Sequence, residues 1–312
     1  ARTDIAKVAY GYLRERARQE RHLTVTNNTR ILNTGIMVLS VTRTLPAYLA
    51  PFVEELELEQ ASLVTMDDLR RIARSRGIRT DAAKIAAALR DRGWLLTTGT
   101  KGVWEFAPGA HAGPFGRGQP FRVVQAVLLA KPDEDVRVCL NSALWAHGLL
   151  DNAPDRPEVA LIPGSRIPSV LQRECRVVKF RSSLATVRLW DVPVHDLPTV
   201  LVHLATAPTD VRSWGLVMEV LPNLVAAATE PGALENLFAE LAPRPASVRT
   251  RLAYLVHGVA PDLASTIVPS DHGVVWFGPR NNTTMRRFDS TYQVADTVLP
   301  MAPGELRPER AQ

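Results

Sequence analysis

Eight basic or hydroxyl-bearing residues between positions 74 and 101 could bind the phosphate backbone of a nucleic acid. Arginine and lysine side chains neutralise phosphate charge, and threonine hydroxyls can donate hydrogen bonds to phosphate oxygens. These candidate DNA-binding residues are Arg74, Arg76, Arg79, Thr80, Lys84, Thr98, Thr100 and Lys101. They fall into two groups, 74–84 and 98–101, so the local structure must bring both groups to one face.

The stretch 66–104 predicts two short helices followed by a β-hairpin. Thr65 can cap the first helix, with Asp68 as its capping-box partner, and Gly77 is a natural stop. Thr80 can cap the second helix, which should end near Gly93. The expected inner faces are Leu69, Ile72 and Ala73 in the first helix and Ala82, Ile85, Ala86 and Leu89 in the second.

Two β-prone runs, 94–98 and 103–106, are separated by a loop with a glycine at each end, Gly99 and Gly102. Helix, turn, helix and hairpin together predict a winged helix-turn-helix. The small outer residues of the second helix, with Lys84 among them, could approach a major groove, and Lys101 at the wing tip suits a phosphate. The alternative is a winged helix used only for protein contacts, with arginines that form a solvated face.

The charge distribution favours DNA binding by this stretch. The whole chain of 312 residues has a net charge of +5. Residues 66–104 carry nine Arg or Lys and four Asp or Glu, whereas residues 105–312 carry twenty and twenty-one. A basic module joined to a near-neutral domain is the pattern expected when one part of the chain faces DNA.

No motif for catalysis or metal binding is present. The sequence lacks His-Glu-x-x-His, paired Cys-x-x-Cys, Gly-x-Ser-x-Gly and a Gly-rich phosphate loop. His195 and Asp196 are adjacent and should point to opposite faces, and Gly164-Ser165 lacks the closely spaced carboxylates of a nucleotidyltransferase. We therefore expect no enzyme activity, no metal and no cofactor. Cys139 and Cys175 should be buried and reduced.

Composition divides the chain into five parts. We expect an extension outside the fold at 1–36, a winged-helix domain at 37–107, a Gly- and Pro-rich linker at 108–120, a C-terminal domain at 121–300 and a loose tail at 301–312. Residues 5–20 could form a basic DNA-binding arm, but we prefer Met37 as the natural start. No apolar run reaches membrane-spanning length and no signal peptide is evident, so we expect a cytoplasmic protein.

The C-terminal domain should be α+β, because strand-like and helix-like patterns both occur in it. A helix is expected at 121–130. Asn141 should cap another helix that extends to His147 and is stopped by Gly148. The expected strands are 136–140, 158–162, 175–180, 186–189, 274–277 and 292–295, and the other expected helices are 199–206, 213–227, 234–241 and 246–256.

Several short motifs, in this order and spacing, resemble the AbiEi-type antitoxins of bacterial type IV toxin–antitoxin systems. The resemblance covers about residues 46–300. The motifs are Asp91-Arg-Gly-Trp-Leu95, Lys101-Gly-Val-Trp-Glu-Phe106, Asn141-Ser-Ala-Leu-Trp-Ala-His-Gly-Leu149, Leu201-Val-His-Leu-Ala-Thr-Ala-Pro208, Arg251-Leu-Ala-Tyr-Leu255 and Tyr292-Gln-Val-Ala-Asp296. None of them is a catalytic motif.

The resemblance implies two roles. An N-terminal winged helix would bind inverted repeats of double-stranded DNA in the promoter and repress the operon. A C-terminal antitoxin domain would counteract a nucleotidyltransferase-like toxin, and this family is often described as acting without a stable toxin complex. The alternatives are a stand-alone transcription factor with a ligand-sensing C-terminal domain, and a nucleic-acid-modifying enzyme that docks through the winged helix.

Overall fold

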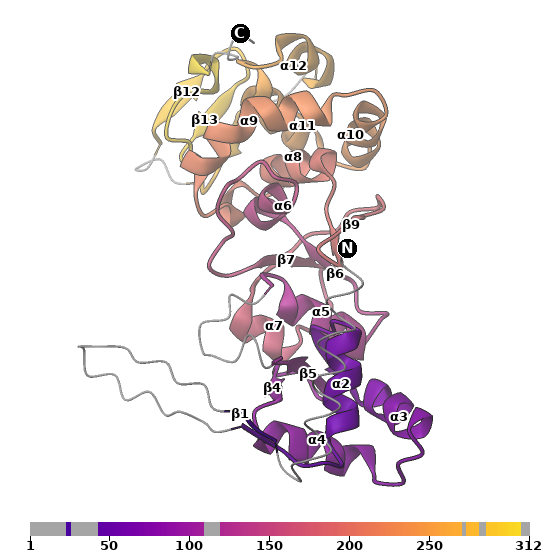
Figure 1. The fold of residues 1–312 in the computed structure, drawn as a ribbon. Helices are drawn as coiled ribbons and strands as arrows, with labels where there is room; N and C mark the ends of the chain where they lie inside the picture. Colours follow the sequence, from indigo (N-terminus) through magenta and orange to yellow (C-terminus); the bar gives the residue numbers. More distant parts are fainter. Residues whose placement is uncertain (1–22, 26–42, 109–118, 270–272, 281–284, 307–312) are drawn as a thin grey trace, which may run out of the picture. The chain divides into compact units, whose positions relative to one another are not determined.

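The computed structural model describes residues 23–25, 43–108, 119–269, 273–280 and 285–306, and Figure 1 shows their arrangement. The chain divides into two compact units, 1–132 and 133–312. Both units mix helices and strands, so the expected α+β class is confirmed. Most of the expected extension 1–36 and of the expected linker 108–120 lies outside the described residues.

The first unit contains two antiparallel sheets and four described helices. Strands β1 and β2 form one sheet, and the order β3-β5-β4 forms the other. Its elements in chain order are β1 (Leu23–Val25), β2 (Arg43–Leu45), α2 (Ala50–Leu58), β3 (Leu63–Thr65), α3 (Met66–Ser75), α4 (Ala82–Asp91), β4 (Leu95–Thr97), β5 (Val103–Phe106) and α5 (Arg122–Ala130).

One hydrophobic core joins α2, α3, α4 and the three-stranded sheet. The apolar faces expected from helical spacing are buried in α3 and α4, and Leu49, Phe52 and Leu56 of the α2 region complete the same core. Helix α5 packs on β3 and β5 and groups with the first unit, whereas the sequence predicts residues 121–130 as part of the C-terminal domain.

The second unit begins with a mixed five-stranded sheet of order β8-β7-β6-β10-β9. Strand β6 lies between β7, which is antiparallel to it, and β10, which is parallel. The elements of this part are β6 (Val136–Val138), α6 (Leu140–Ala146), β7 (Glu158–Leu161), α7 (Ser169–Glu174), β8 (Arg176–Lys179), β9 (Val187–Leu189) and β10 (Val192–Val194).

A helical layer and a small three-stranded sheet complete the second unit. Helix α8 is buried along its length and packs against α6, α9, α10 and α11. The sheet has the order β11-β13-β12. These elements are α8 (Leu197–Thr206), η2 (Pro208–Asp210), α9 (Trp214–Ala228), α10 (Ala233–Leu241), α11 (Ala246–Val256), α12 (Pro261–Ile267), β11 (Val275–Phe277), β12 (Arg287–Asp289), β13 (Val294–Asp296) and η4 (Pro303–Glu305).

Two expected helix caps are wrong. Helix α4 is capped by Asp81 rather than Thr80, because the Asp81 carboxylate accepts a hydrogen bond of 3.0 Å from the Ala83 N–H. Helix α6 begins at Leu140 with Cys139 at the cap position, so Asn141 lies inside the helix. The backbone N–H of Asn141 instead donates to a carboxylate from β7, at 2.8 Å.

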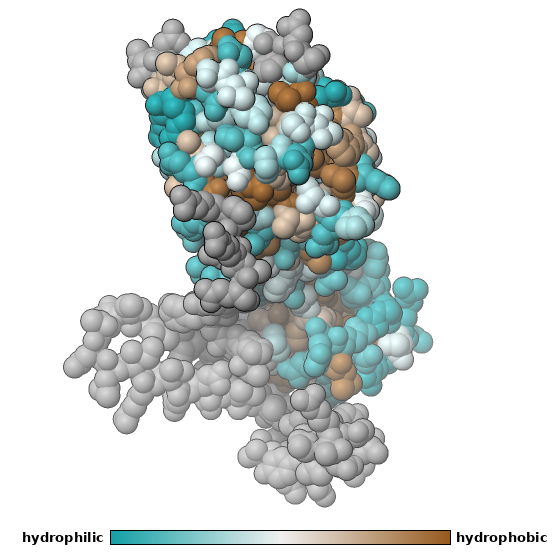
Figure 2. All heavy atoms as spheres, turned by 90° about the horizontal axis from the view of Figure 1, so that it is seen from above, coloured by the Kyte–Doolittle hydropathy of each residue, from teal (hydrophilic) through white to brown (hydrophobic). Residues whose placement is uncertain are grey.

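Figure 2 shows one face of the described residues, coloured by hydropathy. On the face shown in Figure 2, apolar side chains lie in small groups among polar ones. No helix within the described ranges is both long and apolar enough to span a membrane. Part of the expected loose tail is packed, since Pro303 is buried and η4 contacts α11.

Candidate nucleic-acid interface

A capping box and a left-handed glycine position the helices α3 and α4, which together with the turn between them carry four of the five candidate cations. The Thr65 N–H donates to Asp68 at 2.9 Å, and the Asp68 N–H donates back to the Thr65 hydroxyl at 3.2 Å. Gly77 has a φ of 62°, which lets the chain turn sharply out of α3. The turn is closed by the Ile78 N–H, which donates to the Ala73 carbonyl at 2.8 Å.

Helix α4 presents a thin outer face. Ile85 and Leu89 are fully buried on its inner side, while Ala83 and Lys84 are exposed. Small outer side chains let a helix backbone approach another surface closely. Lys84 and Arg79, which lies in the turn before the helix, form no ion pair with any residue that the structure describes.

The loop between β4 and β5 is held by its own threonines. The Thr98 hydroxyl donates to the Val103 carbonyl at 2.8 Å and accepts from the Thr100 N–H at 3.2 Å. The Thr100 hydroxyl oxygen is buried and has no partner among the described residues. Lys101 at the tip is exposed. The threonines therefore shape the loop, and Lys101 is the side chain that the loop presents to solvent.

Some of the candidate arginines are bound to the protein itself. Arg76 forms an ion pair of 2.7 Å with Glu55 of α2, and its side chain is 41% exposed. Arg74 is exposed, and its Nε donates to the Arg70 carbonyl at 3.3 Å. Arg79, Thr80, Lys84 and Lys101 are exposed. Arg79, Lys84 and Lys101 are thus exposed cations that no carboxylate pairs with in the part of the chain that the structure describes.

The second unit contains a buried polar network around Glu158 that the sequence did not reveal. The side chain of Glu158 is 5% exposed, and it accepts from the Arg176 guanidinium and the Asn141 N–H, both at 2.8 Å. The Glu158 N–H donates to the Ser142 hydroxyl at 2.8 Å. Burial raises the pKa of Glu158, and the hydrogen bond from Arg176 opposes that shift. This network joins the start of α6 to β7 and β8.

Two histidines are buried beside Phe180. The rings of Phe180 and His203 stack with centroids 3.8 Å apart, and the centroids of His195 and His203 are 6.0 Å apart. Both ring nitrogens of His195 lack a hydrogen-bond partner in the described part of the chain. The carboxylate of Asp196 caps α8 by accepting a hydrogen bond from the Thr199 N–H, and it accepts none from His195. His195 and Asp196 therefore do not form an acid–base pair.

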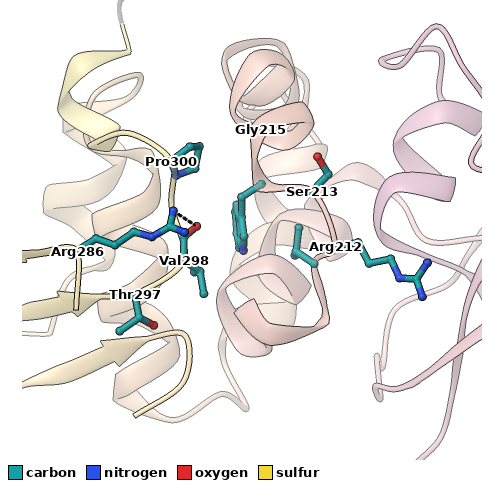
Figure 3. Close-up of a pocket in the computed structure, with 9 residues that line it drawn as sticks. Arg212, Ser213, Gly215, Arg286, Thr297, Val298 and Pro300 are labelled. Carbon is teal, nitrogen blue, oxygen red and sulfur yellow. Dashed lines mark hydrogen bonds between the residues drawn. The ribbon is translucent and has the colours of Figure 1, made fainter. Parts of the chain in front are cut away.

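A hollow in the second unit is a candidate ligand site, and the direction of its lining side chains bears on this role. It is open, has a volume of about 400 Å³, and lies between the start of α9 and residues 297–300, which follow β13. Figure 3 shows that Arg286 turns to the Val298 carbonyl, to which it donates at 3.1 Å, whereas Arg212 points away. Among the described residues, no three His, Cys, Asp or Glu side chains gather as metal ligands.

Two of the motifs that carry the family resemblance meet in space. Tyr254, from the 251–255 motif, donates its hydroxyl proton to Asp296, from the 292–296 motif, at 3.2 Å. Asp296 also accepts from the Val298 and Leu299 N–H groups, both at 2.9 Å. Burial raises the pKa of the Tyr254 hydroxyl, and the Asp296 charge raises it further. These motifs are thus packing and hydrogen-bonding elements of the second unit.

Comparison with known proteins identifies the class of the second unit. Residues 136–257 match the family model described as the AbiEi antitoxin C-terminal domain. This range includes the predicted motifs at 141–149, 201–208 and 251–255. The chain therefore contains an AbiEi antitoxin domain, and the predicted resemblance to AbiEi-type antitoxins is confirmed. This match supports an antitoxin role in a toxin–antitoxin system.

A solved structure has a similar fold over most of the chain. The crystal structure of the Rv2827c protein from Mycobacterium tuberculosis superposes with a TM-score of 0.70 and 25% sequence identity. The similarity covers 83% of this chain and 94% of that chain. No curated protein sequence matches this chain significantly.

Proposed function

We propose that this protein is a DNA-binding antitoxin of a type IV toxin–antitoxin system. Its first unit would repress its own operon, and its second unit would counteract a nucleotidyltransferase-like toxin. The observation that carries the proposal is the match of residues 136–257 to the AbiEi antitoxin C-terminal domain. The proposal makes the protein a non-enzymatic regulator that needs no cofactor.

The order of elements in the first unit supports a winged helix. A helix (α2) and a strand (β3) precede the helix pair α3–α4, and the hairpin β4–β5 follows. In winged-helix and other helix-turn-helix proteins, the second helix of such a pair commonly enters the major groove of DNA. In this chain that helix is α4, whose outer face is small and carries Lys84.

We place the DNA on the surface formed by α4, the turn before it and the hairpin tip. Arg79, Lys84 and Lys101 would contact phosphates, together with Thr80, which precedes the Asp81 cap of α4, and Arg74, which lies in the last turn of α3. The threonines of the hairpin loop, Thr98 and Thr100, would act by holding Lys101 in place. The Arg76 guanidinium is paired with Glu55, so we assign it to the structure of the unit.

Fluorescence anisotropy with a duplex carrying the inverted repeats of the protein's own promoter tests this surface. We expect Lys84→Ala and Lys101→Ala to weaken binding, because each removes a phosphate contact. The slope of log K against log salt should shrink by about one unit per residue. Arg173→Ala, an exposed arginine of the second unit paired with Glu174, serves as the control and should change neither quantity.

Unchanged affinity and unchanged slope in both lysine variants would show that DNA binds another face. A comparable loss in Arg173→Ala would instead point to non-specific attraction by the whole chain. The antitoxin role is tested separately, by asking whether the protein rescues cells that express the adjacent nucleotidyltransferase gene. Failure of rescue would contradict the antitoxin half of the proposal only.

A further inference from the structure

Four acidic residues lie among the nine basic ones between positions 66 and 104, and three of the four have structural roles. Asp67 forms an ion pair of 2.8 Å with Arg70. Asp68 belongs to the capping box of α3, and Asp81 caps α4. The fourth is Asp91, whose carboxylate neither caps a helix nor accepts a hydrogen bond within the described residues. This carboxylate therefore needs another explanation.

Asp91 lies at the end of α4 where a negative charge is unfavourable. It is the last residue of the helix, close to backbone carbonyl groups that carry partial negative charge. Its described counter-ion is the adjacent Arg90, 3.7 Å away, and the two side chains are 66% and 51% exposed. An exposed pair at this distance contributes little. The stability of the first unit does not account for a carboxylate at this position.

Helical spacing places Asp91 on the face of α4 that we assign to DNA. The inner face of the helix consists of Ala82, Ile85, Ala86 and Leu89, which are all buried. Residues three, four and seven positions apart share one face, so Lys84, Ala87 and Asp91 form a line on the opposite side. Lys84 and Asp91 are exposed and lie about 10 Å apart along the helix axis. Between them Ala87 offers only a methyl group, which leaves room for close approach.

The chemistry of a carboxylate limits what this end of the helix can bind on DNA. A carboxylate repels phosphate and only accepts hydrogen bonds. In the major groove, guanine presents two acceptors and thymine presents an acceptor and a methyl group. Adenine presents an amino group beside the acceptor N7, whereas cytosine presents its N4 amino group as a donor. Cytosine is therefore the base that best matches a carboxylate in the groove.

We propose that Asp91 determines the sequence specificity of the DNA-binding site by accepting a hydrogen bond from the N4 amino group of a cytosine. This inference rests on the proposed function, because it requires α4 to enter the major groove. Lys84 and Lys101 supply affinity for the backbone of any sequence. Asp91 weakens binding wherever the cytosine is missing, because its carboxylate is then desolvated without a donor.

Fluorescence anisotropy with a set of duplexes tests the role of Asp91. The full-length protein is titrated with its promoter duplex and with variants in which each base pair of the inverted repeats is replaced in turn. We expect the wild type to require cytosine at one position of each repeat, and its replacement should weaken binding roughly tenfold. Asp91→Ala should lose the preference at that position and keep those at the others. Its affinity for a duplex of scrambled sequence should not fall.

Asp91→Asn should change the preferred base instead of removing the preference. The amide both donates and accepts, so it matches the N7 and N6 groups of adenine, and adenine should replace cytosine at the same position. Loss of folding cannot produce this gain. Thermal denaturation should show Asp91→Asn to be at least as stable as the wild type, because a negative charge leaves the helix C-terminus. Asp67→Asn, at an 85% exposed carboxylate of α3, is the control and should leave the base preferences unchanged.

The outcomes separate this inference from the proposed function. If both Asp91 variants keep the base preferences of the wild type while Lys84→Ala weakens binding, Asp91 does not read a base and the DNA-binding surface stands. An equal loss of affinity for every duplex, or a lower thermal stability of Asp91→Asn, assigns Asp91 to the structure of the unit and also overturns the inference. A wild-type protein that does not bind its promoter duplex overturns both.

Discussion

At the scale of single residues, the second unit contains a buried carboxylate that has hydrogen-bond partners and two buried histidines that have none among the described residues. Glu158 is held by the Arg176 guanidinium and by the backbone of α6, so its charge is compensated. His195 is 1% exposed and His203 is fully buried, and their ring nitrogens have no hydrogen-bond partner in the described residues. The nearest carboxylate, on Asp210, lies 3.8 Å from His203, beyond hydrogen-bond distance.

The two histidines should make the stability of the second unit depend on pH. Burial lowers the pKa of both, and their proximity lowers that of His195 further. In the unfolded chain they bind protons below about pH 6.5, whereas in the folded chain they remain neutral to a lower pH. We therefore expect full stability above that pH and a loss as pH falls, of up to about 1.4 kcal/mol per pH unit for each histidine.

Urea denaturation between pH 7.5 and 5.5 measures this dependence. His203→Leu and His195→Leu place an apolar side chain at the buried positions and remove the titrating group. Each should therefore reduce the slope of the unfolding free energy against pH by up to about 1.4 kcal/mol per pH unit, the value for one proton. Slopes equal to that of the wild type in both variants would mean that other groups cause the pH dependence.

At the scale of secondary structure, local signals predicted most of the helices. The capping box at Thr65 and the periodic apolar residues of α3, α4 and α11 (Ala246–Val256) are set by neighbours within a few positions, so the sequence reveals them. Thr80 and Asp81 can both cap a helix, and a one-residue shift of this kind is decided by tertiary packing.

Three short strands and one distant ion pair were not predicted from the sequence. Strands β3 and β10 pair with β5 and β6, which lie far from them along the chain, and β12 is a three-residue strand at the edge of its sheet. The ion pair between Glu158 and Arg176 joins residues 18 positions apart. Its one sequence signal is a glutamate that opens an apolar run at 158–162.

Replacing Gly258 or Gly215 by alanine should change the stability of the second unit in opposite directions. A Cβ at Gly258, just after α11, would overlap the backbone of Pro303 in η4. A Cβ at Gly215, in the first turn of α9, would meet only the Ser213 hydroxyl at 4.0 Å. Gly258→Ala must displace the η4 segment and should destabilise the unit by about 1–3 kcal/mol.

Gly215→Ala is the matched control. Alanine is the better helix former, so this variant should be neutral or up to about 1 kcal/mol more stable than the wild type. Thermal denaturation of both variants checks the pair. Equal stability of Gly258→Ala and the wild type would show that η4 moves away from α11 at little cost.

At the scale of the whole molecule, the division into two units predicts that repression and toxin neutralisation can be separated. Lys84 and Lys101 belong to the first unit and are exposed. Replacing both by alanine leaves the core of that unit intact, and surface changes of this kind usually alter stability by no more than about 0.5 kcal/mol. We expect the double variant to lose repression of its own promoter, measured with a reporter gene.

The same double variant, expressed from a foreign promoter, should still rescue cells from the toxin. Leu144→Ala supplies the converse case, because Leu144 is fully buried in α6 within the matched antitoxin domain. Its loss should destabilise the second unit by about 2–5 kcal/mol and abolish rescue, while promoter binding by the first unit persists. If the folded double variant fails to rescue, neutralisation depends on DNA binding, and the two functions do not divide between the two units.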